Sequence, residues 1–215
     1  MATTIYMMRH GESEANERDV FLGHGDLKLT QRGREQASMT AAFLKNEIGR
    51  PDAVYSSDLL RAYETGKCTA DQFDMQVVKD KELREIDAGK WDFLTFSQLE
   101  NEFAESYYVW THNIGQARCD GGESVEQLQN RVACAVERIA KRHDNQVVFI
   151  FSHATPIRAF AAYCLKKTRD EIKDVPWAAN ASVTKVTYHE GTFQLEEYSR
   201  DDFMGDLVTA LPENV

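Results

Sequence analysis

Short apolar runs alternate along the chain with longer stretches in which apolar residues recur every three or four positions. The short runs are rich in β-branched and aromatic residues, which is typical of buried strands. The longer stretches indicate amphipathic helices, and capping residues or glycines mark several of their ends. The predicted strands are residues 3–8, 53–55 and 147–151, and the predicted helices are residues 31–48, 59–72, 123–142 and 154–166.

Two further β-rich runs lie near the C-terminus, at residues 182–189 and 192–198, and they flank Glu190-Gly191. This pattern favours a hairpin, although either run could instead pair elsewhere in the sheet. Strands that alternate with helices predict an α/β fold with three layers, α/β/α, around a mostly parallel central sheet. In such sheets ligands bind beyond the carboxyl ends of the strands, so we expect the functional site there.

Residues 88–122 fit this alternation poorly and are dense in aromatic side chains. The aromatic residues are Trp91, Phe93, Phe96, Phe103, Tyr107, Tyr108 and Trp110. We interpret the segment as a small insertion that forms a cap over the site, within a single domain spanning residues 1–215. Most of these aromatics are expected to pack a small core of the insertion itself, and the others could contact a ligand.

The charge balance restricts the partners. Lys and Arg number 25 against 35 Asp and Glu, a formal net charge of −10, which argues against nucleic acid and against an anionic membrane surface. The longest apolar run, 147–151, is far shorter than the roughly 20 residues of a membrane span, and no signal peptide is recognisable. We therefore expect a cytoplasmic protein.

The four cysteines form no Cys-x-x-Cys motif, which argues against a structural zinc site.

Two of the predicted strands, 3–8 and 147–151, are each followed two residues later by a histidine, His10 and His153. Arg9 directly precedes His10. If these strands are parallel neighbours, both imidazoles emerge at the same edge of the sheet. Arg61, in the first turn of the predicted helix 59–72, can also reach this edge. Two guanidinium groups and two imidazoles form a positive pocket of the size of a phosphate. A neutral imidazole can attack phosphorus, while the arginines stabilise the charge on the phosphoryl oxygens.

The leaving oxygen of a phosphate ester needs a proton, and two carboxyl groups could supply it. Glu85 and Asp87 both follow the second predicted helix, residues 59–72, and residue chemistry alone does not choose between them.

The segment Arg9-His10-Gly11-Glu12-Ser13 resembles the signature of the histidine phosphatase superfamily, the phosphoglycerate mutase-like proteins. Further matching segments follow in the same order: residues 21–37, 56–65, 83–91, 121–124 and Ser152-His153. The resemblance covers about residues 3–160.

This resemblance implies roles for individual residues. His10 would be the nucleophile that becomes phosphohistidine, and Glu85, preferred over Asp87 by the family pattern, would be the proton donor. The phosphoryl oxygens would be held by Arg9, Arg61 and His153. Further substrate or phosphate contacts are expected from Asn16, Gly11, Ser13, Gly23, His24 and Ala154. No metal and no organic cofactor is expected.

Two positions depart from the usual pattern of the family, because Ala154 stands where glycine is common and His24 where tryptophan is common. The insertion also differs, since Lys90 is its only basic residue between positions 88 and 117. A bisphosphate would be repelled there, so the sequence favours a phosphatase acting on a small phosphorylated metabolite. The alternatives are a cofactor-dependent mutase and a silent phospho-ligand binding module. The oligomeric state is left open between a monomer and a homodimer.

Overall fold

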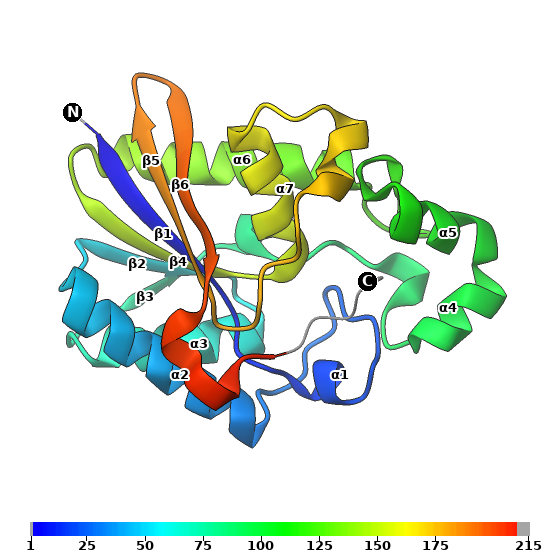
Figure 1. Ribbon diagram of the computed structural model, residues 1–215, viewed down its shortest axis with the longest axis horizontal. Coiled ribbons are helices and arrows are strands. Elements are labelled where there is room, and N and C mark those ends of the chain that lie inside the picture. The colour runs from blue at the N-terminus through cyan, green and yellow to red at the C-terminus, as the bar shows by residue number, and fades with distance from the viewer. Residues whose placement is uncertain (1, 210–215) are drawn as a thin grey trace.

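A six-stranded sheet forms the centre of the computed structural model, which describes residues 2–209 (Figure 1). The strands are β1 (Thr3–Arg9), β2 (Ala53–Ser56), β3 (Val77–Lys79), β4 (Val147–Ser152), β5 (Val183–His189) and β6 (Thr192–Arg200). They lie in the order β3-β2-β4-β1-β5-β6. β1, β2, β3 and β4 are parallel to one another. β5, which forms a hairpin with β6, pairs antiparallel with β1. The prediction of a mostly parallel sheet is confirmed.

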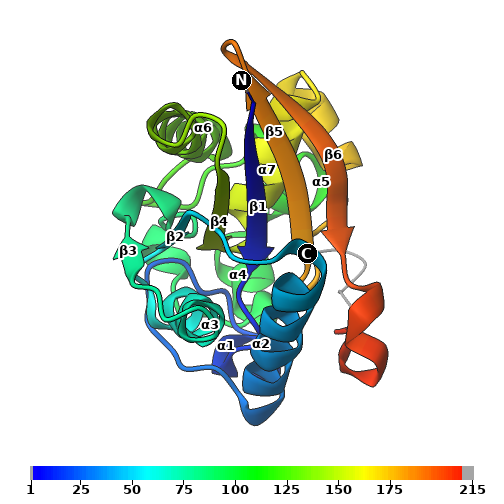
Figure 2. The same ribbon diagram turned by 90° about the vertical axis from the view of Figure 1, so that its left-hand side faces the viewer.

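Helices cover both faces of the sheet (Figure 2). α2 and α3 lie on one face, and α6 and α7 lie on the other. The α-helices are α1 (Glu14–Glu17), α2 (Gln31–Phe43), α3 (Leu60–Asp71), α4 (Phe96–Glu102), α5 (Ala104–His112), α6 (Val125–Arg142) and α7 (Ala154–Cys164). A π-helical turn (Leu44–Ile48) extends α2, and 3-10 turns occupy Lys81–Leu83, Gly89–Trp91, Ile114–Gln116, Arg169–Asp174 and Asp202–Leu207.

The alternation of side chains along the strands divides the core into two layers. Ile5 and Met7 of β1 belong to the cluster that includes α6 and α7, whereas Tyr6 and Met8 belong to the cluster that includes α2 and α3. Successive residues of a strand point to opposite faces, so both faces of β1 are buried. The three-layer α/β/α architecture is therefore as expected from the sequence.

The register between β1 and β4 brings the two histidines to one edge. Arg9 pairs with Ser152, and the backbone N–H of His10 donates to the Ser152 carbonyl oxygen at 3.1 Å. His10 and His153 therefore both follow directly from adjacent strand ends. The expectation that these strands are parallel neighbours is confirmed.

The segment predicted as an insertion contains α4 and α5, which lie at one end of the molecule beyond the sheet (Figure 1). Trp91 and Trp110 are almost fully buried and pack edge-on against Phe21. Most of its aromatic residues thus pack together, as expected, while Tyr108 and Phe93 are exposed. Among residues 2–209, no helix is long and apolar enough to cross a bilayer.

Candidate active site

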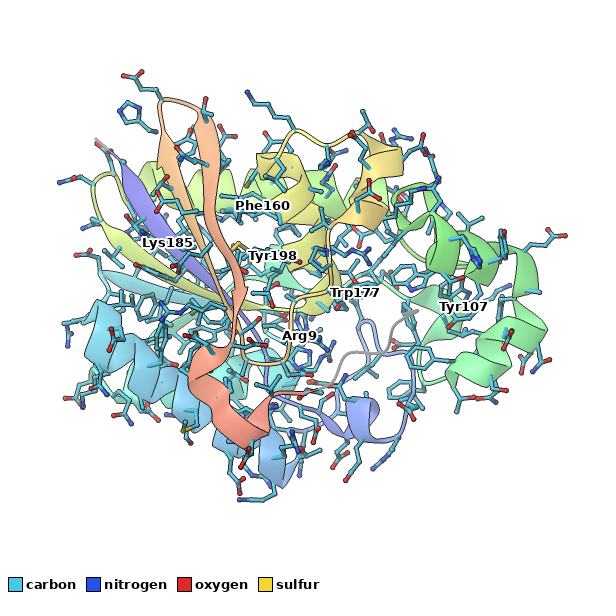
Figure 3. All side chains as sticks on the ribbon, viewed as in Figure 1. Arg9, Tyr107, Phe160, Trp177, Lys185 and Tyr198 are labelled. Carbon is cyan, nitrogen blue, oxygen red and sulfur yellow. The ribbon has the colours of Figure 1, made fainter. Side chains whose placement is uncertain are left out.

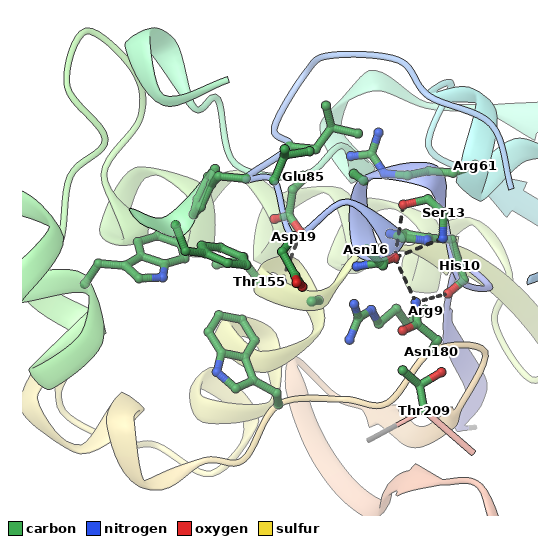
Figure 4. Close-up of a pocket in the computed structure, with 18 residues that line it drawn as sticks. Arg9, His10, Ser13, Asn16, Asp19, Arg61, Glu85, Thr155, Asn180 and Thr209 are labelled. Carbon is green, nitrogen blue, oxygen red and sulfur yellow. Dashed lines mark hydrogen bonds between the residues drawn. The ribbon is translucent and has the colours of Figure 1, made fainter. Parts of the chain in front are cut away.

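A cavity of about 190 Å³ opens beyond the carboxyl ends of β1 and β4. Its walls come from the segments after β1, from α3, α4, α5 and α7, and from the chain before β5. The lining residues are Arg9, His10, Ser13, Ala15, Asn16, Asp19, Val20, Phe21, Leu22, Arg61, Glu85, Phe96, Trp110, Ala154, Thr155, Trp177, Asn180 and Thr209. Figure 4 shows how the polar side chains converge, with Glu85 facing the group formed by Arg9, His10 and Arg61.

His10 is nearly buried, and one hydrogen bond sets its protonation pattern. Its Nδ1 lies 2.7 Å from the carbonyl oxygen of Gly11, which can only accept, so Nδ1 carries the hydrogen and Nε2 keeps its lone pair. Burial, followed by the nearby charges of Arg61 and Arg9, lowers the pKa of His10 well below 6.5. His10 is therefore a neutral imidazole whose Nε2 has no hydrogen-bond partner among residues 2–209.

Arg9 and Arg61 are both buried, and backbone carbonyl groups hold each of them in place. Arg9 donates to the oxygen of Ala178 at 2.7 Å. Arg61 donates to the oxygens of Gly23 and Gly25 at 2.8 and 2.9 Å. Burial lowers the pKa of both guanidinium groups to about 10, so both stay cationic at neutral pH. They supply the positive charge that a phosphoryl group requires.

His153 lies behind His10, with their ring centroids 5.2 Å apart. Its Nε2 is 2.8 Å from the hydroxyl oxygen of Ser57, and its Nδ1 is buried without a partner among the described residues. Burial and then the charge of Arg61 lower its pKa well below 6.5. His153 does not itself line the cavity in this structure.

Glu85 is 7% exposed, and two backbone N–H groups orient its carboxyl group. Its Oε1 accepts from Ile86 at 2.8 Å, and its Oε2 accepts from Thr155 in the first turn of α7 at 3.3 Å. Asp87 is not among the lining residues, and its Oδ1 accepts from the backbone of Gly89 at 3.0 Å. Of the two carboxyl groups, Glu85 is the one at the cavity.

The segment that carries Glu85 is held from behind by Arg131 of α6. This guanidinium donates to the carbonyl oxygens of Glu82, Arg84 and Glu85 at 2.7, 3.1 and 3.2 Å. It also forms a two-point ion pair with Glu123, at 2.9 and 2.8 Å. Sequence reasoning missed Arg131. The signal available was Glu123, which lies in a segment that matches the family pattern.

Three of the proposed binding residues do line the cavity: Ser13, Asn16 and Ala154. Asn16 Oδ1 accepts from both the backbone N–H and the hydroxyl group of Ser13, each at 3.0 Å. This fixes the amide so that its NH₂ group remains available to a ligand.

The other three, Gly11, Gly23 and His24, are not among the lining residues. A Cβ on Gly11 would lie 2.2 Å from the carbonyl oxygen of Gly33, and one on Gly23 would lie 2.4 Å from that of Ile86. The two glycines thus permit close backbone packing behind the cavity. His24 Nε2 donates to the carbonyl oxygen of Glu85 at 3.0 Å, so it supports the Glu85 segment. In this structure these three residues lie behind the cavity wall and not on it.

The chain before β5 contributes lining residues that sequence reasoning did not single out, Trp177 and Asn180. Asn180 donates through Nδ2 to the carbonyl oxygen of His10 at 3.1 Å, which ties this segment to His10. Asp19 and Thr209 also border the cavity. Within residues 2–209, no group of three or more His, Cys, Asp or Glu side chains is arranged to hold a metal ion.

The geometry of this cavity can be compared with known proteins. The family model described as histidine phosphatase superfamily (branch 1) matches residues 5–201. The chain belongs to this superfamily. The resemblance inferred from the Arg9-His10-Gly11 motif is thereby confirmed, and so is the prediction of a phosphatase-type enzyme.

Two curated relatives illustrate the range within the superfamily. Phosphoserine phosphatase 1 of Hydrogenobacter thermophilus is 34% identical over 160 residues, which cover 74% of each chain. Phosphoglycerate mutase-like protein 4 of Arabidopsis thaliana is 30% identical over 189 residues, which cover 87% of this chain and 80% of the relative.

Two solved structures are similar to almost the whole chain. YhfR of Bacillus stearothermophilus has a TM-score of 0.89 at 26% identity, covering 94% of this chain and 99% of that one. A mycobacterial glucosyl-3-phosphoglycerate phosphatase has a TM-score of 0.83 at 26% identity, covering 94% of this chain and all of that one.

Proposed function

We propose that this histidine phosphatase hydrolyses the phosphate monoester of a small metabolite through a phosphohistidine intermediate on His10. The observation that carries the proposal is the environment of this imidazole. Its Nδ1 hydrogen is engaged by Gly11, its Nε2 is free, and Arg9 and Arg61 flank the space where a phosphoryl group would sit. Names of relatives that include phosphoserine phosphatase and glucosyl-3-phosphoglycerate phosphatase support the same class of reaction.

In the first step the lone pair on His10 Nε2 attacks phosphorus, and the bond between phosphorus and the ester oxygen breaks. Glu85, entering this step protonated, transfers its proton to the departing oxygen, so the alcohol leaves neutral. Arg9 and Arg61 stabilise the negative charge on the non-bridging oxygens, assisted by Asn16 and by the backbone at Ala154, while His153 lies behind His10 and outside the cavity wall.

In the second step Glu85, now a carboxylate, removes a proton from water, and the water oxygen attacks phosphorus. The phosphorus–nitrogen bond breaks, inorganic phosphate leaves, and His10 and Glu85 return to their starting states. A mutase would instead return the phosphoryl group to a second hydroxyl of a bound phosphoglycerate. The scarcity of basic residues in the 88–122 segment supports hydrolysis over this alternative.

The test measures phosphate release from 4-nitrophenyl phosphate by the wild-type enzyme, His10→Ala and the matched control His189→Ala, which alters an exposed histidine in β5. We expect His10→Ala to lose activity, the control to keep it, and a chelator to have no effect. Retained activity in His10→Ala, or isomerisation of 3-phosphoglycerate with bisphosphoglycerate faster than phosphate release, would overturn the proposal.

A further inference from the structure

The cavity has a second half, beyond the phosphate end, that is built mainly from apolar and aromatic groups. Phe96 of α4 and Trp110 of α5 approach from one side, and Trp177 from the chain before β5. In the view of Figure 3, Trp177 lies between the strand end that carries Arg9 and the helix that carries Tyr107. A leaving group attached to a phosphate at His10 would extend toward these rings.

The Trp177 ring is held in place from two directions. The guanidinium of Arg158 lies over its face, 4.2 Å from the ring centroid, and that guanidinium also donates to the carbonyl oxygen of Lys173 at 2.9 Å. The Trp110 ring lies roughly parallel to it, with centroids 6.2 Å apart. A fixed indole presents apolar area to a ligand at little cost in side-chain entropy.

Among residues 2–209, no residue that lines this half of the cavity carries a permanent positive charge, and Arg158, which lies over the face of Trp177, is not a lining residue. Among the described lining residues the permanent cations are Arg9 and Arg61, and both lie at the phosphate end. Residues 210–215, outside the description, include no Lys, Arg or His in the sequence. The carboxylate of Asp19, an exposed residue at the edge of the cavity, adds a negative charge.

Asn180 adds a hydrogen-bond acceptor. Because its Nδ2 donates to the carbonyl oxygen of His10, the orientation of the amide is fixed. Its Oδ1 is buried and has no partner among the described residues, and Figure 4 shows the side chain beside Arg9 at the cavity. A hydroxyl or amine on the substrate would satisfy this oxygen, since an unpaired buried acceptor costs free energy.

We propose that this subsite selects phosphate monoesters whose alcohol carries an apolar or aromatic face and no second anionic group, with Asp19 excluding the second anion. The inference rests on the proposed function and deepens it, because it names the class of leaving group. It assigns Phe96, Trp110 and Trp177 to recognition and Asp19 to selection.

The first experiment compares substrates in matched pairs. Glycerol phosphate and 3-phosphoglycerate differ only by a hydroxymethyl group in place of a carboxylate, and benzyl phosphate and methyl phosphate differ by the aromatic ring. We expect kcat/KM to be roughly tenfold higher for the first member of each pair. Equal values within both pairs, or a preference for 3-phosphoglycerate, would overturn the inference.

The second experiment reverses the charge at Asp19. Asp19→Arg should raise kcat/KM for 3-phosphoglycerate relative to glycerol phosphate roughly three- to tenfold, because a partner for the carboxylate replaces a repelling charge. Glu190→Arg is the control: Glu190 is exposed in the β5–β6 turn, and its φ of 48° matches the 51° of Asp19. This control makes the same change in net charge and should leave the ratio unchanged.

The third experiment removes the aromatic wall. Trp177→Ala should lower kcat/KM for benzyl phosphate roughly tenfold while changing that for methyl phosphate less than twofold. Trp177→Leu, which keeps apolar volume, should give an intermediate value. Two results would overturn the proposed substrate selection while leaving the proposed hydrolysis intact. One is an equal loss of kcat/KM for benzyl and methyl phosphate in both Trp177 variants. The other is an unchanged ratio of kcat/KM for 3-phosphoglycerate to that for glycerol phosphate in Asp19→Arg. Absence of hydrolysis of every ester by the wild-type enzyme would instead refute the proposed function and this inference together.

Discussion

Replacing Arg131 tests whether the segment behind the cavity sets the position of the Glu85 carboxyl. Arg131→Met removes the donors to the carbonyl oxygens of Glu82, Arg84 and Glu85 and leaves the carboxylate of Glu123 without its ion-pair partner. Methionine keeps a similar apolar stem, so packing along α6 is retained.

The magnitude follows from the burial of the pair. The Arg131 and Glu123 side chains are only 16% and 14% exposed. Breaking a fully buried pair costs about 3–5 kcal/mol, so this pair, with slight access to water, should cost about 3 kcal/mol of unfolding free energy. Arg138 on the same helix is the matched control. Its side chain is 59% exposed in an ion pair with Asp80, so Arg138→Met should cost about 0–1 kcal/mol.

The assay separates a shift of Glu85 from general destabilisation by varying the leaving group. An alkyl oxygen needs a proton to depart, whereas 4-nitrophenolate departs without one, so only the alkyl ester depends strongly on the acid. At a temperature where both variants are folded, Arg131→Met should lower kcat/KM for an alkyl phosphate about tenfold or more and kcat/KM for 4-nitrophenyl phosphate by much less, because kcat/KM reports the first step and not the hydrolysis of the phosphoenzyme, which is common to both esters. Equal losses for both esters, or a stability change as small as that of Arg138→Met, would refute this reasoning.

Three further predictions concern other parts of the site. The pKa values of His10 and His153 are depressed by burial, so below pH 6.5 the unfolded chain takes up protons that the folded enzyme does not. In urea titrations the free energy of unfolding should thus fall as the pH drops below 6.5, and it should fall less in His153→Gln. Equal dependence of the unfolding free energy on pH in the wild type and in His153→Gln would contradict this. Gly33→Ala should cost about 3 kcal/mol in thermal or urea unfolding, because its Cβ would lie 1.9 Å from the carbonyl oxygen of Glu12, whereas Ser38→Ala in the same helix should cost under about 0.5 kcal/mol. Arg61→Lys should lower kcat/KM about 100-fold, since a lysine cannot bond two carbonyls and a phosphate in the same plane; an effect below threefold would argue against its role.

The parts of the fold that were predictable have local signals in the sequence. The apolar runs of β1 and β4 stop at Arg9 and Ser152. Because the carboxyl ends of adjacent parallel strands lie at the same edge of a sheet, His10 and His153 could be predicted to lie close together. The hairpin of β5 and β6 follows from Glu190-Gly191. By contrast, β3 was missed because it has three residues, of which two are exposed, and so shows no alternation.

The parts of the site that were not predictable depend on tertiary contacts. Arg131 lies on the polar side of an amphipathic helix that also carries Arg138 and Arg142, and nothing in the helical pattern distinguishes them. Trp177 and Asn180 lie in a loop, where the direction of the side chains does not repeat at a regular spacing along the sequence. Their positions depend on hydrogen bonds from Arg9 and to His10, which only the folded backbone defines.

The most direct measurement of the central claim is to trap the covalent intermediate. Brief mixing with a ³²P-labelled ester and quenching in base should leave label on the peptide that carries His10. The label should be stable in base and lost in acid, as expected for a phosphoramidate. Glu85→Gln should accumulate more label with an aryl ester, because it cannot activate water, and His10→Ala should carry none. Turnover of the wild-type enzyme without any base-stable label, or label on His10→Ala equal to that on the wild type, would contradict the account.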